Sequence, residues 1–134
     1  MTTADERTIA ALLVNPENER YFQAAREGTL LLGLCKDCKE YHFYPRVLCP
    51  HCFSDKIEWL PAKGAGMIYS FSTLHRGVPV PYTIAYVTLD EGVSMMTNIV
   101  DCDADVLNIG DKVKLVFKTA VDGSLLPMFT LAGP

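Results

Sequence analysis

The chain has 134 residues, 49% of them hydrophobic, and its 16 acidic and 12 basic residues give a formal net charge of −4. This composition excludes a largely disordered chain, and the length excludes a second large domain. No apolar run approaches the roughly 20 residues that span a bilayer, and Met1–Glu6 lacks the features of a signal peptide, so we expect a cytoplasmic protein outside the membrane.

The first 28 residues predict a helical segment made of two short helices. The apolar positions of the first helix are Ile9, Leu12 and Leu13. Asn15 is expected to cap the second helix, Pro16 to occupy its first position and Gly28 to end it. Residues 29–34 are rich in leucine and lack helix caps, so they predict a strand that leads into the first pair of cysteines.

Residues 29–63 predict a zinc ribbon, because they contain two CxxC pairs separated by ten residues. The four cysteines are Cys35, Cys38, Cys49 and Cys52. Each pair can place two thiolates on one tetrahedral metal from a tight turn. Four thiolates leave no open position for water or substrate, so we expect one structural zinc per chain. Iron of the rubredoxin type has the same ligands and stays an alternative, as do a redox pair and unrelated buried thiols.

Other candidate ligands and nucleophiles carry less weight. His42 and His51 lie near the cysteines, but four thiolates already complete the metal site, so we expect exposed or hydrogen-bonded loop residues. Phe43 is expected to cover the site. Cys102 stands between Asp101 and Asp103, whose charges disfavour a thiolate, and we interpret it as a structural thiol rather than a nucleophile.

Residues 64–134 predict a mainly β domain. Five β-rich runs are separated by turn signals, and they cover residues 67–74, 83–89, 93–100, 113–117 and 125–131. Five antiparallel strands in about seventy residues avoid exposed edges by closing on themselves. We therefore expect a five-stranded, OB-like barrel at the C-terminal end of the chain.

A ribbon joined to an OB-like barrel raises the possibility of nucleic-acid binding. A barrel that follows a phosphate backbone needs a basic groove, whereas residues 64–134 carry four basic and seven acidic residues. Aromatic residues that are able to stack on bases are more typical of a core or a partner surface; they are Tyr69, Phe71, Tyr82 and Tyr86. We expect no nucleic-acid partner and keep a stand-alone binding module for single-stranded nucleic acid or another ligand as the alternative.

From about Asn15 to Phe129 the chain resembles the bacterial and archaeal proteins formerly called domain of unknown function thirty-five. The motifs that carry the resemblance are Ala25-Arg26-Glu27-Gly28, Leu30-Leu31-Leu32-Gly33, the double CxxC with Tyr44-Pro45-Arg46, Gly64-Ala65-Gly66, Leu89-Asp90-Glu91-Gly92 and Ile109-Gly110-Asp111-Lys112-Val113. The resemblance implies an N-terminal helical segment, a rubredoxin-like ribbon with the four cysteines as zinc ligands, and an OB-fold. It also implies a non-catalytic partner of a thiolase-like or synthase-like subunit that forms or cleaves carbon–carbon bonds in acyl-CoA or related acyl substrates.

The sequence departs from this family after the second cysteine of each pair. Relatives often have glycine there, whereas this chain has Lys39 and Phe53, so we expect slightly opened turns around the metal. The chain contains no GxSxG, Walker, GxGxxG or HExxH motif, and the resemblance places the nucleophile on the partner. We therefore expect the isolated chain to be inactive.

Docking to a catalytic subunit requires apolar or aromatic surface. The candidate contacts with the partner or with CoA at the interface are Tyr41, Phe43, Tyr44, His75, Arg76, Tyr82 and Tyr86. His75 and Arg76 are the polar members of this set and suit either the partner or the phosphates of CoA.

Overall fold

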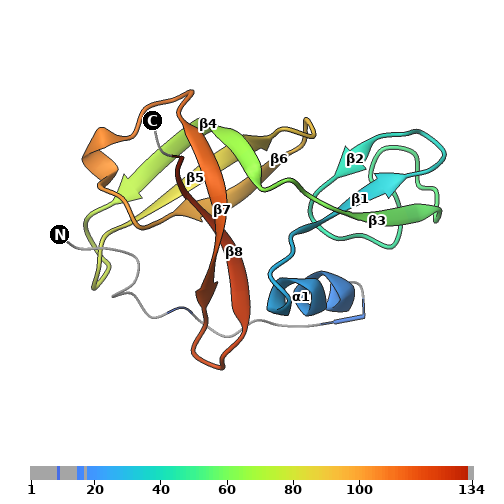
Figure 1. Ribbon diagram of the computed structural model, residues 1–134, viewed down its shortest axis with the longest axis horizontal. Coiled ribbons are helices and arrows are strands. Elements are labelled where there is room, and N and C mark those ends of the chain that lie inside the picture. The colour runs from blue at the N-terminus through green and yellow to red at the C-terminus, as the bar shows by residue number, and fades with distance from the viewer. Residues whose placement is uncertain (1–8, 10–14, 17, 133–134) are drawn as a thin grey trace.

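The computed structural model describes residues 9, 15–16 and 18–132, and shows a mainly β protein with one short α-helix (Figure 1). The elements are α1 (Glu19–Arg26), β1 (Leu31–Cys35), β2 (Tyr41–His42), β3 (Ile57–Pro61), β4 (Ala65–Leu74), β5 (Tyr82–Leu89), β6 (Ser94–Ile99), the 3-10 helix η2 (Ala104–Val106), β7 (Lys112–Thr119) and β8 (Leu125–Leu131). No helix in the described part of the chain is long and apolar enough to cross a membrane.

Helix α1 begins later than the sequence predicts. Asn15 and Asn18 close a turn on each other: Asn18 N donates to Asn15 Oδ1 at 3.0 Å, and Asn15 N donates to Asn18 Oδ1 at 2.7 Å. This turn contains Pro16, so the helix starts at Glu19 rather than at the proline. Its end is as predicted, because Gly28 has a φ of +82° and its N–H donates to the carbonyl of Ala25 at 3.0 Å.

The other predicted helix, around Ile9, Leu12 and Leu13, lies outside the described residues except for Ile9. Ile9 has no regular secondary structure, and its carbonyl accepts a hydrogen bond of 2.8 Å from the N–H of Val121.

The ribbon is a three-stranded antiparallel sheet with the order β2-β1-β3. Strand β1 is central, and Gly33 in it lies opposite His42 of β2 and Trp59 of β3. Strand β2 is only two residues long, so most of the chain between the cysteine pairs forms loops. Cys35 ends β1 and Cys38 lies in the turn after it, whereas Cys49 and Cys52 lie in the loop between β2 and β3.

The barrel contains all five strands predicted from the sequence. It closes in the order β4-β5-β6-β8-β7, with β7 pairing back to β4, and β6 and β8 run parallel. Buried and exposed residues alternate at the start of β7, as the sequence predicts, since Val113 is buried between exposed Lys112 and Lys114. Further along, Lys118 folds onto Asp101, with 2.7 Å between Nζ and Oδ2. The structure therefore confirms the predicted fold class.

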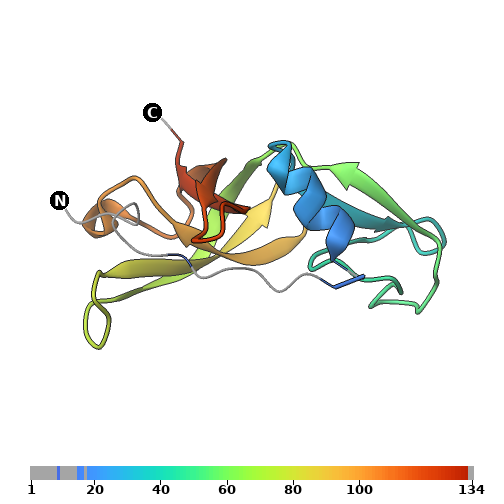
Figure 2. The same cartoon turned by 90° about the horizontal axis from the view of Figure 1, so that it is seen from below.

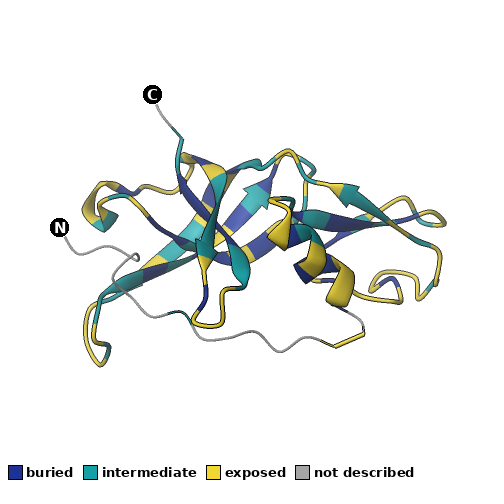
Figure 3. Cartoon of the chain, turned by 60° about the horizontal axis from the view of Figure 1, so that its bottom comes forward, coloured by how far each residue is buried: buried dark blue, intermediate teal, exposed yellow. Residues whose placement is uncertain are grey.

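One hydrophobic core joins the helix, the ribbon strand β1 and the barrel. Tyr21 and Phe22 of α1 and Leu30 and Leu32 at β1 belong to the same buried cluster as Phe129 of β8. Figure 2 shows α1 lying between the ribbon sheet and the barrel, and Figure 3 shows buried residues running from β1 into the barrel strands. This shared core fixes the ribbon against the barrel.

Candidate metal centre

Four thiols converge beside the ribbon sheet. The Sγ atoms of Cys35 and Cys52 lie 3.5 Å apart, and those of Cys38 and Cys49 lie 3.6 Å apart. All four Sγ atoms lie within 4.8 Å of one another. Tetrahedral zinc with Zn–S bonds of about 2.3 Å separates its sulfur ligands by about 3.8 Å. The donor set and its spacing therefore fit one zinc ion with a closed coordination sphere.

The two CxxC turns have the same local geometry. Lys39 N donates to the carbonyl of Cys35 at 2.9 Å, and Phe53 N donates to the carbonyl of Cys49 at 2.8 Å. In each turn a backbone N–H also faces the first sulfur, and the donor in the first turn is Cys38, 3.4 Å from Cys35 Sγ. This amide is the main cause that lowers the pKa of the Cys35 thiol to about 6. The first turn thus favours the thiolate form of Cys35, whereas burial and the neighbouring thiols raise the pKa of Cys38 and Cys52.

The expectation of opened turns is wrong. Lys39 has a φ of 66° and Phe53 a φ of 64°, which is the left-handed region that glycine adopts without strain. Both turns keep their closing hydrogen bonds. The chain therefore preserves the geometry by placing ordinary residues in an unfavourable backbone conformation, at a cost of about 1–2 kcal/mol each.

His42 is not a loop residue, contrary to the expectation from the sequence. Only 3% of it is exposed, and neither ring nitrogen has a hydrogen-bond partner among the described residues. Its ring lies over Gly33, where any side chain would collide with it, and meets Trp59 edge-on at 6.4 Å between ring centroids. Burial lowers the pKa of His42, so the ring is held neutral. His51 is exposed, as expected.

Cys102 lies at the edge of the barrel core, partly buried against it. Its neighbours have structural partners: Asp101 pairs with Lys118, and Asp103 caps η2 by accepting from Asp105 N at 2.9 Å. The role of Cys102 as a structural thiol stays a prediction.

The candidate contact residues fall into separate regions. Tyr41 and Phe43 are half-buried and pack against the core, so they stabilise the junction between ribbon and helix. Tyr44 is 39% exposed, and its hydroxyl accepts from Asn18 Nδ2 at 3.1 Å.

On the barrel, His75 and Arg76 are exposed in the connection between β4 and β5, Tyr82 is half-buried at the start of β5, and Tyr86 is 50% exposed. The roles of these residues as contacts stay predictions.

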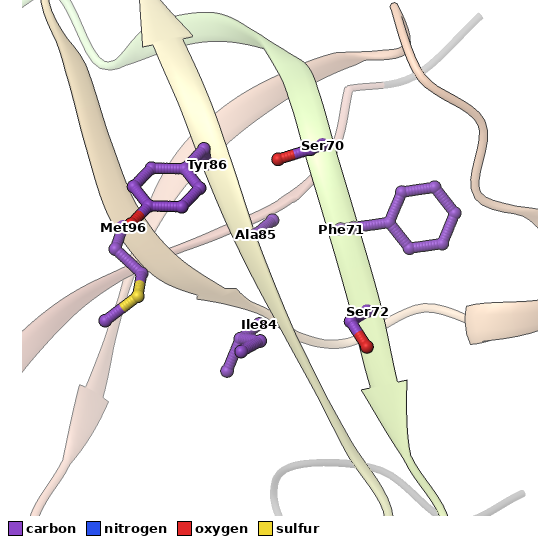
Figure 4. A pocket seen from close by; sticks show the side chains of 7 residues that line it. All are labelled: Ser70, Phe71, Ser72, Ile84, Ala85, Tyr86 and Met96. Atoms are coloured by element: carbon purple, nitrogen blue, oxygen red, sulfur yellow. The ribbon is translucent and has the colours of Figure 1, made fainter.

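Sequence reasoning missed much of the exposed apolar surface. Met96 lies directly opposite Tyr86 on the outer face of the barrel, and both residues border a shallow groove of 160 Å³ with Ile84 (Figure 4). Large apolar side chains are also exposed on β4 and on the ribbon loops. On β4 they are Met67 and Tyr69, and on the ribbon loops they are Val47, Leu48 and Phe53. The signal for the barrel surface was present in the alternation of β6, whose outward positions include a methionine.

A zinc ribbon that precedes a closed OB barrel on a shared core defines the class of this protein. Two family models match in that order: the rubredoxin-like zinc ribbon domain of ChsH2 over residues 22–58 and the C-terminal OB-fold domain of ChsH2 over residues 59–118. A chain in the solved structure of the Ltp2-ChsH2(DUF35) aldolase has 32% sequence identity and a TM-score of 0.80, and the match covers 92% of this chain and 100% of that one. The protein belongs to the DUF35 family, and its ribbon contains a structural zinc.

Curated relatives carry different names. A DUF35 domain-containing scaffold protein of Methanothermobacter thermautotrophicus is 38% identical over 63% of this chain and 68% of that protein. A probable enoyl-CoA hydratase alpha subunit of Thermomonospora curvata is 34% identical over 90% of this chain, which spans only 39% of that protein. The benzoylsuccinyl-CoA thiolase subunit BbsA of Thauera aromatica is 28% identical over 66% of this chain and 62% of that protein.

We expect elemental analysis of the purified chain to give one zinc per chain, and Cys38→Ser to lose both the metal and the fold of the ribbon. The reason is that metal binding supplies the folding free energy of a small ribbon. Cys102→Ser is the matched control, since this thiol lies outside the cluster, and it should keep the zinc. Folded wild-type protein without zinc would contradict the prediction, whereas equimolar iron would change only the identity of the metal.

We expect Lys39→Gly to stabilise the zinc-loaded protein by about 0.5–1 kcal/mol, because glycine removes the strain of the positive φ but loses more backbone entropy on folding. Lys39→Ala is the control for the loss of the side chain and should change the free energy of unfolding by less than about 0.5 kcal/mol. Denaturant unfolding at saturating zinc measures both variants. A destabilised glycine variant would show that the lysine side chain matters more than the backbone strain.

We expect the free energy of unfolding to fall as the pH drops below about 6.5, because the unfolded chain protonates His42 while the folded chain keeps it neutral. The loss has a slope of up to about 1.4 kcal/mol per pH unit for this single site. His42→Phe should remove that part of the slope, and His75→Gln, which changes an exposed histidine, should leave it in place. Denaturation at pH 5–8 with saturating zinc tests this, and equal slopes for wild type and His42→Phe would refute it.

Proposed function

We propose that this chain is a non-catalytic, zinc-containing accessory subunit of a thiolase-superfamily complex. The complex would form or cleave carbon–carbon bonds in acyl-CoA or related acyl substrates. The observation that carries the proposal is the combination of a closed thiol cluster with an exposed apolar barrel face. A metal without an open position is suited to structure rather than to chemistry. An exposed apolar face is suited to a partner.

The names of similar proteins support this role. Their names include a scaffold protein, an aldolase complex, a thiolase subunit and a hydratase subunit, all of which suit a chain that works with a catalytic partner. Each of those activities belongs to the protein that carries the name. Two of the names are those of a subunit of an enzyme that acts on a CoA thioester, and we propose that this chain is likewise one subunit of such an enzyme.

We place the docking surface on the outer face of β4, β5 and β6. Tyr86 and Met96 lie opposite each other there, and Met67 and Tyr69 extend the apolar surface along β4. Lys112 lies opposite Met67 in register, so a cation borders the apolar face. His75 and Arg76 are suited to polar contacts with the partner or with the phosphates of CoA at the other end of β4.

We expect the chain alone to be inactive and the mixture with its thiolase-like partner to turn over an acyl-CoA substrate. The test is co-expression with the thiolase-like protein encoded beside it, followed by comparison of acyl-CoA cleavage or condensation for each protein and for the mixture. Tyr86→Ala combined with Met96→Ala should weaken the complex by at least about tenfold, since central aromatic anchors dominate interfaces.

Ile109→Ala is the matched control, because Ile109 is 71% exposed but lies in the loop before β7. It should leave complex formation unchanged. Turnover by the chain alone would overturn the accessory role, and full activity of the partner without any complex on size-exclusion chromatography would do the same.

We expect no salt-sensitive binding of single-stranded DNA or RNA at physiological ionic strength, because residues 64–134 carry four basic and seven acidic residues. Fluorescence anisotropy with labelled oligonucleotides measures this directly. Submicromolar binding that weakens steeply with salt would instead favour the alternative, a stand-alone OB-fold module.

A further inference from the structure

The barrel is closed at β6 and β8 by very little pairing. The two strands share one paired position, Ile99 opposite Phe129, and the N–H of Val100 donates to the carbonyl of Phe129 at 2.8 Å. The neighbouring seam between β7 and β8 pairs over the whole length of β8. Towards the start of β6 the two strands therefore separate, and Pro127 in this part of β8 has no N–H to donate.

A groove of 310 Å³ occupies this open part of the seam. Helix α1 and the segment after β2 wall it on one side, and β6 and β8 wall it on the other. Its lining residues are Tyr21, Phe22, Phe43, Tyr44, Met95, Met96, Thr97, Asn98, Leu126, Pro127 and Met128. The set contains four aromatic rings and three thioethers but no Lys, Arg, Asp or Glu. The groove is therefore built for an uncharged, mainly apolar group.

One wall of the groove carries an unsatisfied hydroxyl. Thr97 is only 8% exposed, and its Oγ1 is buried with no hydrogen-bond partner among the described residues. A buried hydroxyl without a partner is costly, and native structures nearly always satisfy such a group. Nearby Thr83 shows the usual solution, since its Oγ1 lies 2.8 Å from the hydroxyl of Thr73. Thr97 is one of the residues that line the groove, so a ligand there would reach this covered hydroxyl once the side chains around it move aside.

We propose that this seam groove binds the apolar end of an acyl chain that carries a neutral oxygen, and that the Thr97 hydroxyl donates a hydrogen bond to that oxygen. A ketone, hydroxyl or thioester oxygen fits, whereas a free carboxylate would enter without a countercharge. The volume lies at the lower end of the range for ligand sites, so the groove holds the end of a chain rather than a whole acyl-CoA. The choice of an acyl ligand rests on the proposed function.

The position of the groove agrees with that function. Met96 borders the outer groove of the barrel (Figure 4) and is also one of the residues that line the seam groove, so the seam groove lies beside the proposed docking surface. A catalytic subunit docked there would present its acyl channel to the seam. The accessory chain would then help to select the acyl end of the substrate while the partner performs the chemistry.

The methionines of the chain provide a direct test. Three of its five methionines line the groove, and Met67 lies on the outer face as an internal reference. The zinc-loaded full chain, labelled with ¹³C at the methionine methyl groups, is titrated with 2-octanone and followed by NMR. We expect saturable shifts at Met95, Met96 and Met128 and no shift at Met67. Octanoyl-CoA should give the same pattern, whereas CoA alone and octanoate should not.

Two buried threonines form a matched pair of variants. Thr97→Val keeps the shape but removes the unpaired hydroxyl, so it should raise the melting temperature of the free chain and weaken 2-octanone binding about tenfold. Thr83→Val removes a hydroxyl that has a partner, so it should lower the melting temperature and leave the affinity unchanged. The affinity change at Thr97 is the readout that a purely structural threonine would not give.

Absence of saturable shifts in the wild-type chain would overturn the proposal without any need for a variant, and so would equal affinity in Thr97→Val. Equal binding of octanoate would show that the groove does not select a neutral oxygen and would also contradict it. These titrations use the chain alone, whereas the accessory role is tested by complex formation and turnover. Failure of the groove and failure of the proposed function are therefore distinguishable.

Discussion

The arrangement of the ribbon depends on the convergence of four sulfur atoms. Between Cys35 and Glu58 the buried residues are Cys35, His42, Pro45 and Cys49, so this stretch has almost no hydrophobic core of its own. The metal replaces that core, because coordination supplies the free energy that so small a sheet lacks. Strand β1 connects the ribbon to the rest of the protein, since Leu32 on this strand packs in the hydrophobic core shared with the barrel.

The sequence predicted best what depends on local patterns. The five barrel strands and the turns between them follow from alternation and turn residues, and the CxxC spacing defined the metal cluster. The start of α1 was missed because Asn15 and Asn18 bond to each other instead of capping at Pro16. His42 was missed because its burial depends on Gly33, which only the register of β1 and β2 brings opposite it.

No local pattern in the sequence predicts the seam groove. Its walls come from α1, the segment after β2, β6 and β8, which are far apart in the sequence. The feature that creates it is the separation of β6 from β8 beyond Ile99, and this depends on how the barrel closes rather than on any residue pattern. The exposed pair of Met96 and Tyr86 on the outer face is partly predictable from the sequence. Strand alternation indicates that each side chain points outward, but not which side chain lies opposite it.

Two buried polar side chains without hydrogen-bond partners, His42 and Thr97, differ in what surrounds them, and this decides whether the missing bond affects stability or ligand binding. The ring of His42 is enclosed between Gly33 and Trp59, and it lines neither the outer groove nor the seam groove. Its ring stays neutral, which avoids the larger cost of burying a charge, and its unpaired nitrogens affect stability. Thr97 has a similar degree of burial, but its residue borders 310 Å³ of space lined by flexible thioethers and aromatic rings. The unpaired hydroxyl of Thr97 therefore has a different consequence from the unpaired nitrogens of His42, since a ligand in the seam groove would supply its missing hydrogen bond.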